Sequence, residues 1–198
     1  MVKIRKQVEA NLELIYGLLG LQFEYLKERQ ALALAKGREN LVRSLTKMQE
    51  KLLGSSALTN IDFASYVRNL IERLCDSYQV DTNRLVFNLK IEDIFLGIKT
   101  AIPCGLIISE LVTNALKHAF PNGARGRITV EFYTEESKKY CLIVSHNGRR
   151  FPQQQNLPEA MATALQIVSD LVAQLRGELK LDRRGGMKFK ISFPQEES

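Results

Sequence analysis

The chain has 198 residues, of which 45% are hydrophobic and 25% are charged, and both fractions are ordinary for a globular protein. This length allows one sizeable domain, or a smaller domain with an appended unit. The apolar runs are all shorter than the roughly 18 residues that a membrane span needs, and the charged N-terminus lacks a signal-peptide core. We therefore expect a cytoplasmic protein with no membrane segment.

The formal net charge of +6 raises the question of nucleic-acid binding. Basic side chains alternate with glutamates in the N-terminal third, as at Lys27 to Arg29, and no basic block with interleaved aromatic residues occurs. Nucleic acid is therefore not an expected partner. The excess positive charge is typical of a solvated protein surface, and it could also bind an acidic protein partner.

The three cysteines, Cys75, Cys104 and Cys141, are widely spaced and stand among apolar residues. This pattern predicts buried free thiols rather than disulfides or a metal site. The two histidines have no metal-ligand spacing, so a zinc site is not expected.

Residues 3–53 contain no proline and carry two neighbouring lines of apolar residues at helical spacing. A single helix of that length would expose both lines, so we predict a helical hairpin. The turn falls at residues 27–30 or near Gly37, and the pattern leaves both positions open. Because one hairpin cannot cover both lines, two hairpins are expected to form a four-helix bundle. Residues 3–53 are therefore predicted to form a homodimer.

Gly54, Ser55 and Ser56 end this hairpin, so we predict domains at residues 1–55 and 56–198. The second unit is predicted to mix helices with strands, packed as an α/β sandwich with its helices on one face of the sheet. The fold class is thus α+β. The expected elements are an extended entry at 59–63, helices at 63–78, 100–118 and 158–175, and strands at 84–91, 127–133, 140–145, 178–181 and 188–193.

Four polar residues of the predicted helix 100–118 fall within about a quarter-turn of one another: Glu110, Asn114, Lys117 and His118. We call this set the polar stripe. An acid, an amide, an ammonium and an imidazole on one side could hold a divalent ion and its phosphates. The simpler interpretation is a solvated helix face. However, the remaining sides are rich in leucine and isoleucine, which predicts a largely buried helix whose polar groups need partners.

The segment from Thr100 to Pro121 resembles the N box of bacterial sensor histidine kinases of the second dimerisation subgroup. These two-component signalling proteins pair a helical-hairpin dimerisation domain with an ATP-binding domain of the Bergerat type, which gyrase, Hsp90 and MutL share. The resemblance covers roughly residues 3–194. It implies a Bergerat-type fold for the second unit.

The resemblance also implies roles for the polar stripe. In the family, the residue at the position of Asn114 holds the Mg²⁺ that bridges the ATP phosphates. The residue at the position of Glu110 polarises water or an attacking group, and those at Lys117 and His118 approach the phosphates. All four residue types are present, which favours a site for ATP and Mg²⁺.

Two positions depart from the family's next motif, Asp-Asn-Gly-x-Gly-x-Pro. His146 replaces the aspartate that accepts the adenine amino hydrogen, and Arg150 replaces a glycine that lets the backbone approach the nucleotide, while Gly148 is retained. A neutral histidine can accept one hydrogen bond, whereas a protonated one cannot. We therefore expect weakened adenine recognition. Residues 146–148 can equally be read as a turn that ends a strand.

The lid and the phosphoacceptor depart further. Ala164 lies where the family has a lid glycine, and Lys6 aligns with the histidine that receives the phosphoryl group when Asn11 and Leu12 are matched to the family's Asn-Leu. A lysine of ordinary pKa is protonated and has no free lone pair for attack. Both histidines of the chain lie in the second unit. Autophosphorylation by the family's mechanism is therefore not expected.

These observations favour a degenerate histidine kinase, or pseudokinase, that acts as a dimeric scaffold or regulator. Its expected partner is the receiver domain of a response regulator or another kinase. The alternative is an enzyme that still binds Mg-ATP and acts as an ATPase or phosphorylates a histidine in another chain, with Glu110 in the catalytic role. The two hypotheses differ in whether ATP and Mg²⁺ bind at all.

Overall fold

The computed structural model describes residue 20 and residues 61–150 and 159–195. Gly20 is helical. The predicted hairpin turn, the homodimer interface, the boundary at residue 55 and Lys6 all lie outside the described residues. Residues 153–156, which precede the predicted third helix and contain no glycine of the kind a phosphate-binding lid uses, also lie outside the described residues.

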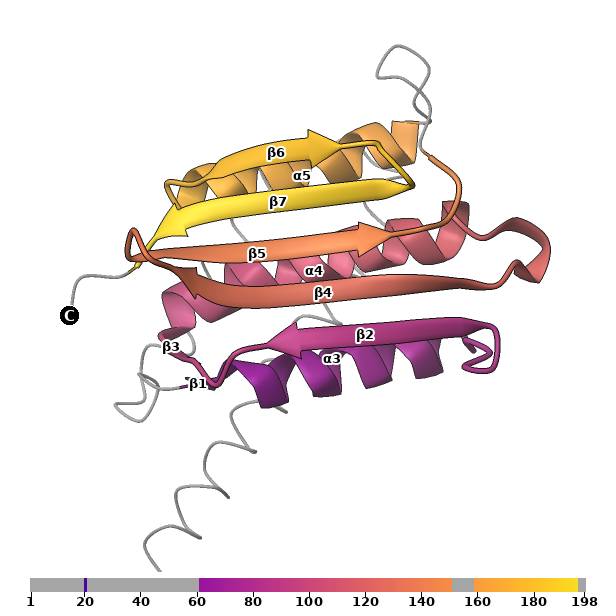
Figure 1. Ribbon diagram of the computed structural model, residues 1–198, viewed down its shortest axis with the longest axis horizontal. Helices are drawn as coiled ribbons and strands as arrows, with labels where there is room; N and C mark the ends of the chain where they lie inside the picture. The colour runs from indigo at the N-terminus through magenta and orange to yellow at the C-terminus, as the bar shows by residue number, and fades with distance from the viewer. Residues whose placement is uncertain (1–19, 21–60, 151–158, 196–198) are drawn as a thin grey trace, which may run out of the picture.

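A five-stranded mixed sheet forms one layer of the second unit (Figure 1). Strand β2 (Leu85–Ile91) runs parallel to β4 (Gly126–Glu135), and the other neighbouring strands are antiparallel. A separate pair, β1 (Ile61–Asp62) and β3 (Phe95–Leu96), is antiparallel. In spatial order the sheet strands are β2 (Leu85–Ile91), β4 (Gly126–Glu135), β5 (Lys139–His146), β7 (Met187–Pro194) and β6 (Glu178–Asp182).

Three helices cover one face of this sheet, and they are α3 (Phe63–Ser77), α4 (Ile98–His118) and α5 (Glu159–Gln174) (Figure 1). A short 3-10 turn, η1 (Pro121–Gly123), follows α4. The predicted α/β sandwich with its helices on one face is confirmed. The predicted helices and strands are present, and α4 begins two residues earlier than expected.

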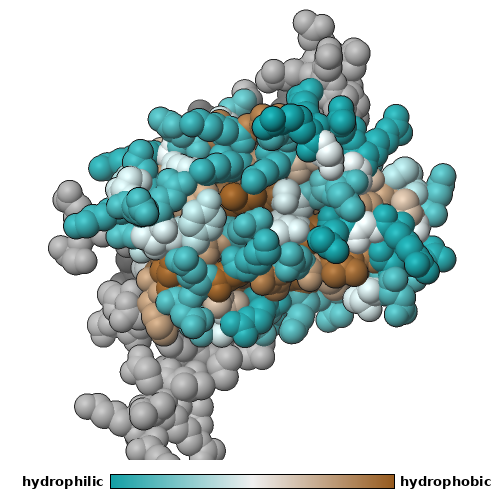
Figure 2. Space-filling model, viewed as in Figure 1, coloured by the Kyte–Doolittle hydropathy of each residue, from teal (hydrophilic) through white to brown (hydrophobic). Residues whose placement is uncertain are grey.

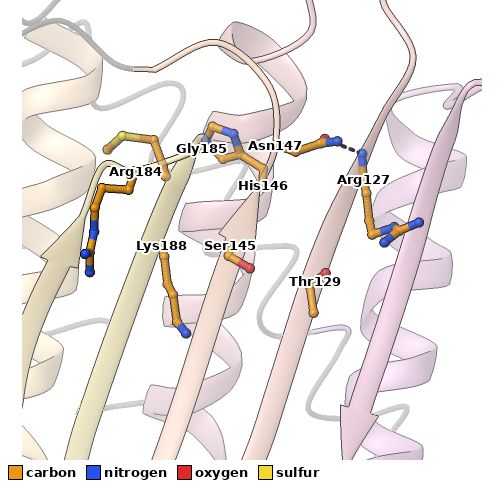
Figure 3. A pocket seen from close by; sticks show the side chains of 9 residues that line it. Arg127, Thr129, Ser145, His146, Asn147, Arg184, Gly185 and Lys188 are labelled. Atoms are coloured by element: carbon orange, nitrogen blue, oxygen red, sulfur yellow. Dashed lines mark hydrogen bonds between the residues drawn. The ribbon is translucent and has the colours of Figure 1, made fainter.

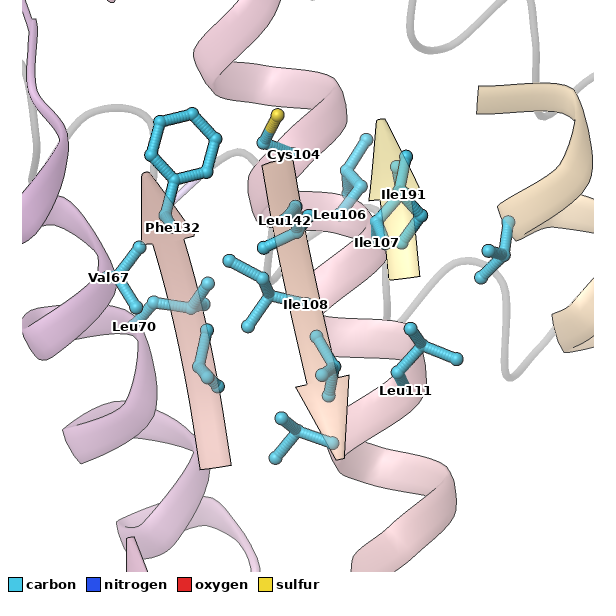
Figure 4. Close-up of a cluster of buried hydrophobic side chains, with 14 of the residues drawn as sticks. Val67, Leu70, Cys104, Leu106, Ile107, Ile108, Leu111, Phe132, Leu142 and Ile191 are labelled. Atoms are coloured by element: carbon cyan, nitrogen blue, oxygen red, sulfur yellow. The ribbon is translucent and has the colours of Figure 1, made fainter. Parts of the chain in front are cut away.

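The core lies between the sheet and the helices (Figure 4). Alternate residues of a strand point to opposite faces, so Val130 and Phe132 of β4 and Leu142 of β5 point toward the helices and are fully buried. Helix α4 is central and buries Leu106 and Ile107, among others. Burying one such aliphatic side chain stabilises the fold by about 1.5–3 kcal/mol.

The cysteines all lie within the described residues, and all three are free thiols. Cys104 and Cys141 are buried as predicted, whereas Cys75 near the end of α3 is only half-buried. Burial, followed by the nearby carboxylates of Asp76 and Glu72, raises the pKa of the Cys75 thiol.

Helix α4 packs against α3 at Gly105. A Cβ added to Gly105 would overlap the hydroxyl and ring of Tyr66, which is 1% exposed and has no room to move. We expect Gly105→Ala to lower the free energy of unfolding by about 1–3 kcal/mol, because overpacking outweighs the roughly 1 kcal/mol that alanine gains in a helix. Urea denaturation measures this change.

The matched control is Gly20→Ala, because a Cβ at this helical glycine would have nothing within 4 Å. Its stability should equal or slightly exceed that of the wild-type protein. Equal stability of the two alanine variants would contradict the close α3–α4 contact at Gly105.

Candidate functional site

The structure divides the polar stripe of α4 into a buried half and an exposed half. Glu110 and Asn114 are only 1% and 6% exposed, whereas Lys117 and His118 in the last turn are exposed. The Lys117 Nζ lies 5.6 Å from the centre of the Tyr78 ring, within cation–π range. The solvated-face interpretation therefore holds for Lys117 and His118 but not for Glu110 and Asn114.

Asn114 is the residue of the stripe whose surroundings most suggest a ligand. Its amide Nδ2 is buried, and among the described residues no hydrogen-bond partner is found for it. A buried donor without a partner costs about 1–3 kcal/mol, so such groups call for an explanation. A ligand oxygen within reach would satisfy this donor. The amide Oδ1 is a ligand of the hard-oxygen type that Mg²⁺ accepts.

Within the described residues, no group of three or more His, Cys, Asp or Glu side chains could hold a metal ion. An all-protein metal cage is thus not found there. Mg²⁺ is commonly held by one or two protein oxygens together with substrate phosphates, and Asn114 with the nearby Glu110 fits that arrangement. The residues present therefore fit a nucleotide-bound Mg²⁺ better than a resident metal.

His146 ends β5 on the face of the sheet that the helices cover. It is 7% exposed, and its ring lies edge-on to Phe120 with the ring centres 6.0 Å apart. Burial lowers the pKa of His146 from 6.5 to about 4. The imidazole is therefore neutral at pH 7, which leaves one ring nitrogen able to accept a hydrogen bond.

Asn147 has a structural role at the end of the same strand. The Asn147 Oδ1 accepts a hydrogen bond from the Arg127 backbone N–H at 2.7 Å, and its own backbone N–H donates to the Arg127 carbonyl at 3.2 Å (Figure 3). These bonds extend the pairing of β4 with β5 by one residue. The interpretation of residues 146–148 as a strand-ending turn therefore has a physical basis at Asn147.

Gly148 joins the end of β5 to the end of α4. A Cβ at this position would overlap the Ala119 carbonyl and the Phe120 ring, and the next backbone N–H, of Arg149, donates to the Ala119 carbonyl at 2.7 Å. Only glycine allows this approach. The contact holds His146 beside the C-terminal end of the helix that carries Asn114.

Arg150 and Ala164, the two other positions that depart from the family motifs, lie in different surroundings: one is exposed and the other is buried. Arg150 is exposed, so its side chain does not fill the space beside the buried part of α4. Ala164 is fully buried in α5 and packs into the protein interior. Because Ala164 is buried within a helix, its backbone N–H is not exposed to a phosphate group.

Two contacts at this site involve residues that the sequence analysis did not single out. Phe120 lies against both His146 and Gly148. Gly186, with φ of +136°, lies so close to the His146 carbonyl that a Cβ could not fit. The Gly185–Gly186 pair is a sequence signal for a turn, but only the structure shows that this turn lies on the end of β5.

The lowered pKa of His146 predicts a pH-dependent stability. Between pH 6.5 and about 4 the unfolded chain binds a proton at this residue and the folded chain does not, so stability falls as pH falls. Relative to a His146→Gln variant, the wild-type protein should lose up to about 3 kcal/mol over this range. Urea denaturation at a series of pH values measures the difference, and parallel curves would contradict it.

Comparison with known proteins is consistent with this geometry. A family model described as "Histidine kinase" matches residues 4–78. A second model, described as "Histidine kinase-, DNA gyrase B-, and HSP90-like ATPase", matches residues 100–197. The chain belongs to the histidine kinase family. It has the family's dimerisation and ATPase-like regions in that order.

Two named histidine kinases are similar over most of the chain. The sensor histidine kinase PdtaS of Mycobacterium tuberculosis is 31% identical over 186 residues, which cover 89% of this chain and 35% of PdtaS. The blue-light-activated histidine kinase 2 of Erythrobacter litoralis is 26% identical over 179 residues, 90% of this chain and 49% of the relative. This histidine kinase core therefore spans half or less of either relative.

A solved structure supports the fold. The histidine kinase domain of the Erythrobacter litoralis blue-light-activated kinase EL346 superposes with a TM-score of 0.64 at 21% identity, covering 94% of each chain. The predicted fold, a helical region followed by a Bergerat-type ATPase sandwich, is thus shown. In the described part of the histidine kinase core, no helix has the length and apolarity to cross a bilayer.

Proposed function

We propose that this histidine kinase core has lost autophosphorylation and acts as a dimeric scaffold or regulator in two-component signalling. Its partner is the receiver domain of a response regulator or a catalytically competent kinase. What supports the proposal is Lys6, which falls at the position of the phosphoacceptor histidine when Asn11 and Leu12 are matched to the family's Asn-Leu. A protonated ammonium cannot attack the γ-phosphate of ATP.

The chain offers no replacement acceptor near Lys6 in the sequence. Its two histidines are His118, exposed at the end of α4, and His146, buried at the end of β5. Both belong to the ATPase-like unit rather than to residues 3–53. This placement supports the loss of the family's phosphorylation step.

The scaffold role rests on the domain division at residues 1–55 and 56–198 and on a homodimer formed by residues 3–53. The apolar lines of that segment need a second hairpin to cover them, which supports the dimer. We expect sedimentation equilibrium of the full chain to give twice the monomer mass. A Leu19→Glu variant should shift it toward the monomer, because it places a charge on the apolar line. A monomeric wild-type protein at micromolar concentration would contradict the dimer.

Labelling with ATP tests the main proposal directly. The purified protein is incubated with γ-labelled ATP and Mg²⁺, and acid-labile, alkali-stable label is counted on the chain. We expect none above a no-enzyme blank. Robust incorporation would overturn the proposal. Titration of the full chain against candidate receiver domains then tests the scaffold role.

A second candidate function is Mg-ATP binding with ATPase activity or phosphorylation in trans. It is favoured by the buried Asn114 amide, whose donor lacks a partner among the described residues, and by the buried Glu110 beside it. When bound, Mg²⁺ would offset the charge of the phosphates. Calorimetry with millimolar Mg-ATP should then show binding that Asn114→Asp alters. If the heat does not exceed dilution, this candidate fails.

A further inference from the structure

The outer face of the sheet, opposite the helices, carries a feature that neither function uses. Strand alternation places Thr129 of β4, Ser145 of β5 and Lys188 of β7 on this face, side by side in one row of the register. Their neighbours Ile128, His146 and Met187 point toward the helices and are buried. Figure 2 shows the outer face, which is largely hydrophilic.

A hollow of about 250 Å³ lies at the end of this face where β4 begins, β5 ends and β7 begins (Figure 3). We call it the basic hollow. It combines cations with hydroxyl and amide groups, and its polar lining includes Arg127, Thr129, Ser145, Asn147, Arg184 and Lys188. It is on the opposite side of the sheet from α4 and Asn114, and His146 at the end of β5 borders both this hollow and the candidate nucleotide site.

The positive charge of the chain is concentrated around this hollow. The three segments that meet there, residues 125–129, 145–150 and 182–188, contain seven Lys or Arg residues and one acid, Asp182. The excess of basic over acidic residues in these three segments therefore equals the formal net charge of the whole chain, +6. The segments are far apart in the sequence, but His146 pairs with Ile128 on one side and with Met187 on the other.

Two of the cations in the basic hollow are available to a ligand. Arg184 is engaged, because it donates from Nε and Nη2 to the Asp182 carboxylate at 3.1 and 2.9 Å. Arg127 and Lys188, in contrast, are exposed and form no ion pair with any described residue, and Lys188 acts on the Asp182 carboxylate only through space, from the opposite position on the neighbouring strand. They flank the hydroxyls of Thr129 and Ser145 (Figure 3).

We propose that the basic hollow is a second anion site that binds a compact ligand with two or more phosphate groups. Guanidinium, ammonium and hydroxyl groups are the donors that phosphate oxygens take. The volume is below the 300–1,000 Å³ that is usual for larger ligands, so a small anion fits better than a bulky one. The lining contains no Phe, Tyr or Trp side chain, so it offers no platform for nucleic-acid bases.

Calorimetric titration of the full chain with inorganic pyrophosphate at about 0.15 M salt tests this site. The test variant is Arg127→Glu/Lys188→Glu. The matched control is Lys90→Glu/Lys180→Glu, which makes the same charge change on the same sheet face outside the hollow. We expect the test variant to weaken binding by at least about tenfold for each lost cation, and the control to change it less than about threefold.

Two outcomes would overturn the proposal. One is that the wild-type protein does not bind pyrophosphate. The other is that the two double variants weaken pyrophosphate binding equally, which would indicate attraction by the overall positive charge of the sheet face rather than a site. Asn114→Asp should leave pyrophosphate binding to the basic hollow intact, so loss of the ATP site and loss of this site are distinguishable. Thermal unfolding of each variant verifies that it is folded.

A second experiment distinguishes a free phosphate ligand from the phosphate groups of a lipid surface. The full chain is sedimented with phosphatidylglycerol vesicles. Pyrophosphate binding without co-sedimentation supports a free phosphate ligand. Co-sedimentation that the test variant loses and the control keeps, together with pyrophosphate binding, supports phosphate recognition on a lipid surface. Co-sedimentation without pyrophosphate binding contradicts the compact phosphate site.

Discussion

The His146→Asp variant is expected to bind ATP about ten times more tightly than the wild-type protein. His146 is neutral at pH 7 because burial lowers its pKa to about 4, so it offers the adenine amino group a single neutral acceptor. A carboxylate is an acceptor only, and a hydrogen bond to a charged group contributes about 1.5–3 kcal/mol, against about 0.5–1.5 kcal/mol for a bond to a neutral group. The difference of about 1–1.5 kcal/mol corresponds to about a tenfold change in the dissociation constant. Calorimetry with Mg-ATP measures the change.

Two controls separate adenine recognition from a general effect on the site. GTP has a carbonyl where ATP has the amino group, so the aspartate variant should gain affinity for ATP and not for GTP. His146→Asn, which has a neutral acceptor of similar shape to aspartate, should gain less than His146→Asp. If ATP and GTP gain equally, His146 does not occupy the adenine-reading position.

The Lys6→His/His146→Asp double variant is expected to incorporate phosphate from γ-labelled ATP, whereas the wild-type protein is not. At pH 7 only about 0.04% of lysine side chains of ordinary pKa are unprotonated, while most histidine side chains carry a free lone pair. The double change therefore restores a nucleophile and strengthens nucleotide binding. The product should be acid-labile and alkali-stable, as expected for phosphohistidine. Scintillation counting after gel separation measures it.

The control for this gain is Lys6→Gln/His146→Asp, which removes the lysine charge without adding a nucleophile. It should stay unlabelled, and α-labelled ATP should leave no label on any variant. Labelling of the glutamine variant would indicate a different acceptor. An unlabelled Lys6→His/His146→Asp protein that binds ATP tightly would show that the lid around Ala164, and not the acceptor alone, prevents transfer.

Much of the second unit was predictable because its elements have strong local signals. The predicted helix at 63–78 is observed as α3, from Phe63 to Ser77, and its start is fixed by Asp62, whose carboxylate accepts a hydrogen bond from the Ser65 N–H. The predicted strands at 127–133 and 140–145 pair as expected, in a register that extends to Lys139 and Glu135. The two-residue strand β3 was not predicted, because two residues show no periodicity.

The candidate site was predictable only in part. Helical spacing placed Glu110, Asn114, Lys117 and His118 on one side of α4, but spacing cannot say where along the stripe the solvent begins. The tertiary structure buries Glu110 and Asn114 and leaves Lys117 and His118 in the last turn exposed. The burial of His146, and with it the neutral imidazole, likewise depends on contacts with Phe120 and Gly186 that come from other segments.

The sequence by itself determined the family and the order of the elements of the second unit, because these depend on residue identity and on periodicities that act over a few residues. Only the tertiary structure decided which polar groups are buried and where the positive charge gathers. The basic hollow takes its charge from three segments that are separated by fifteen residues or more and meet through sheet pairing. Electric fields and burial depend on distances in space, and those distances are set by strand pairing and by the packing of helices on the sheet.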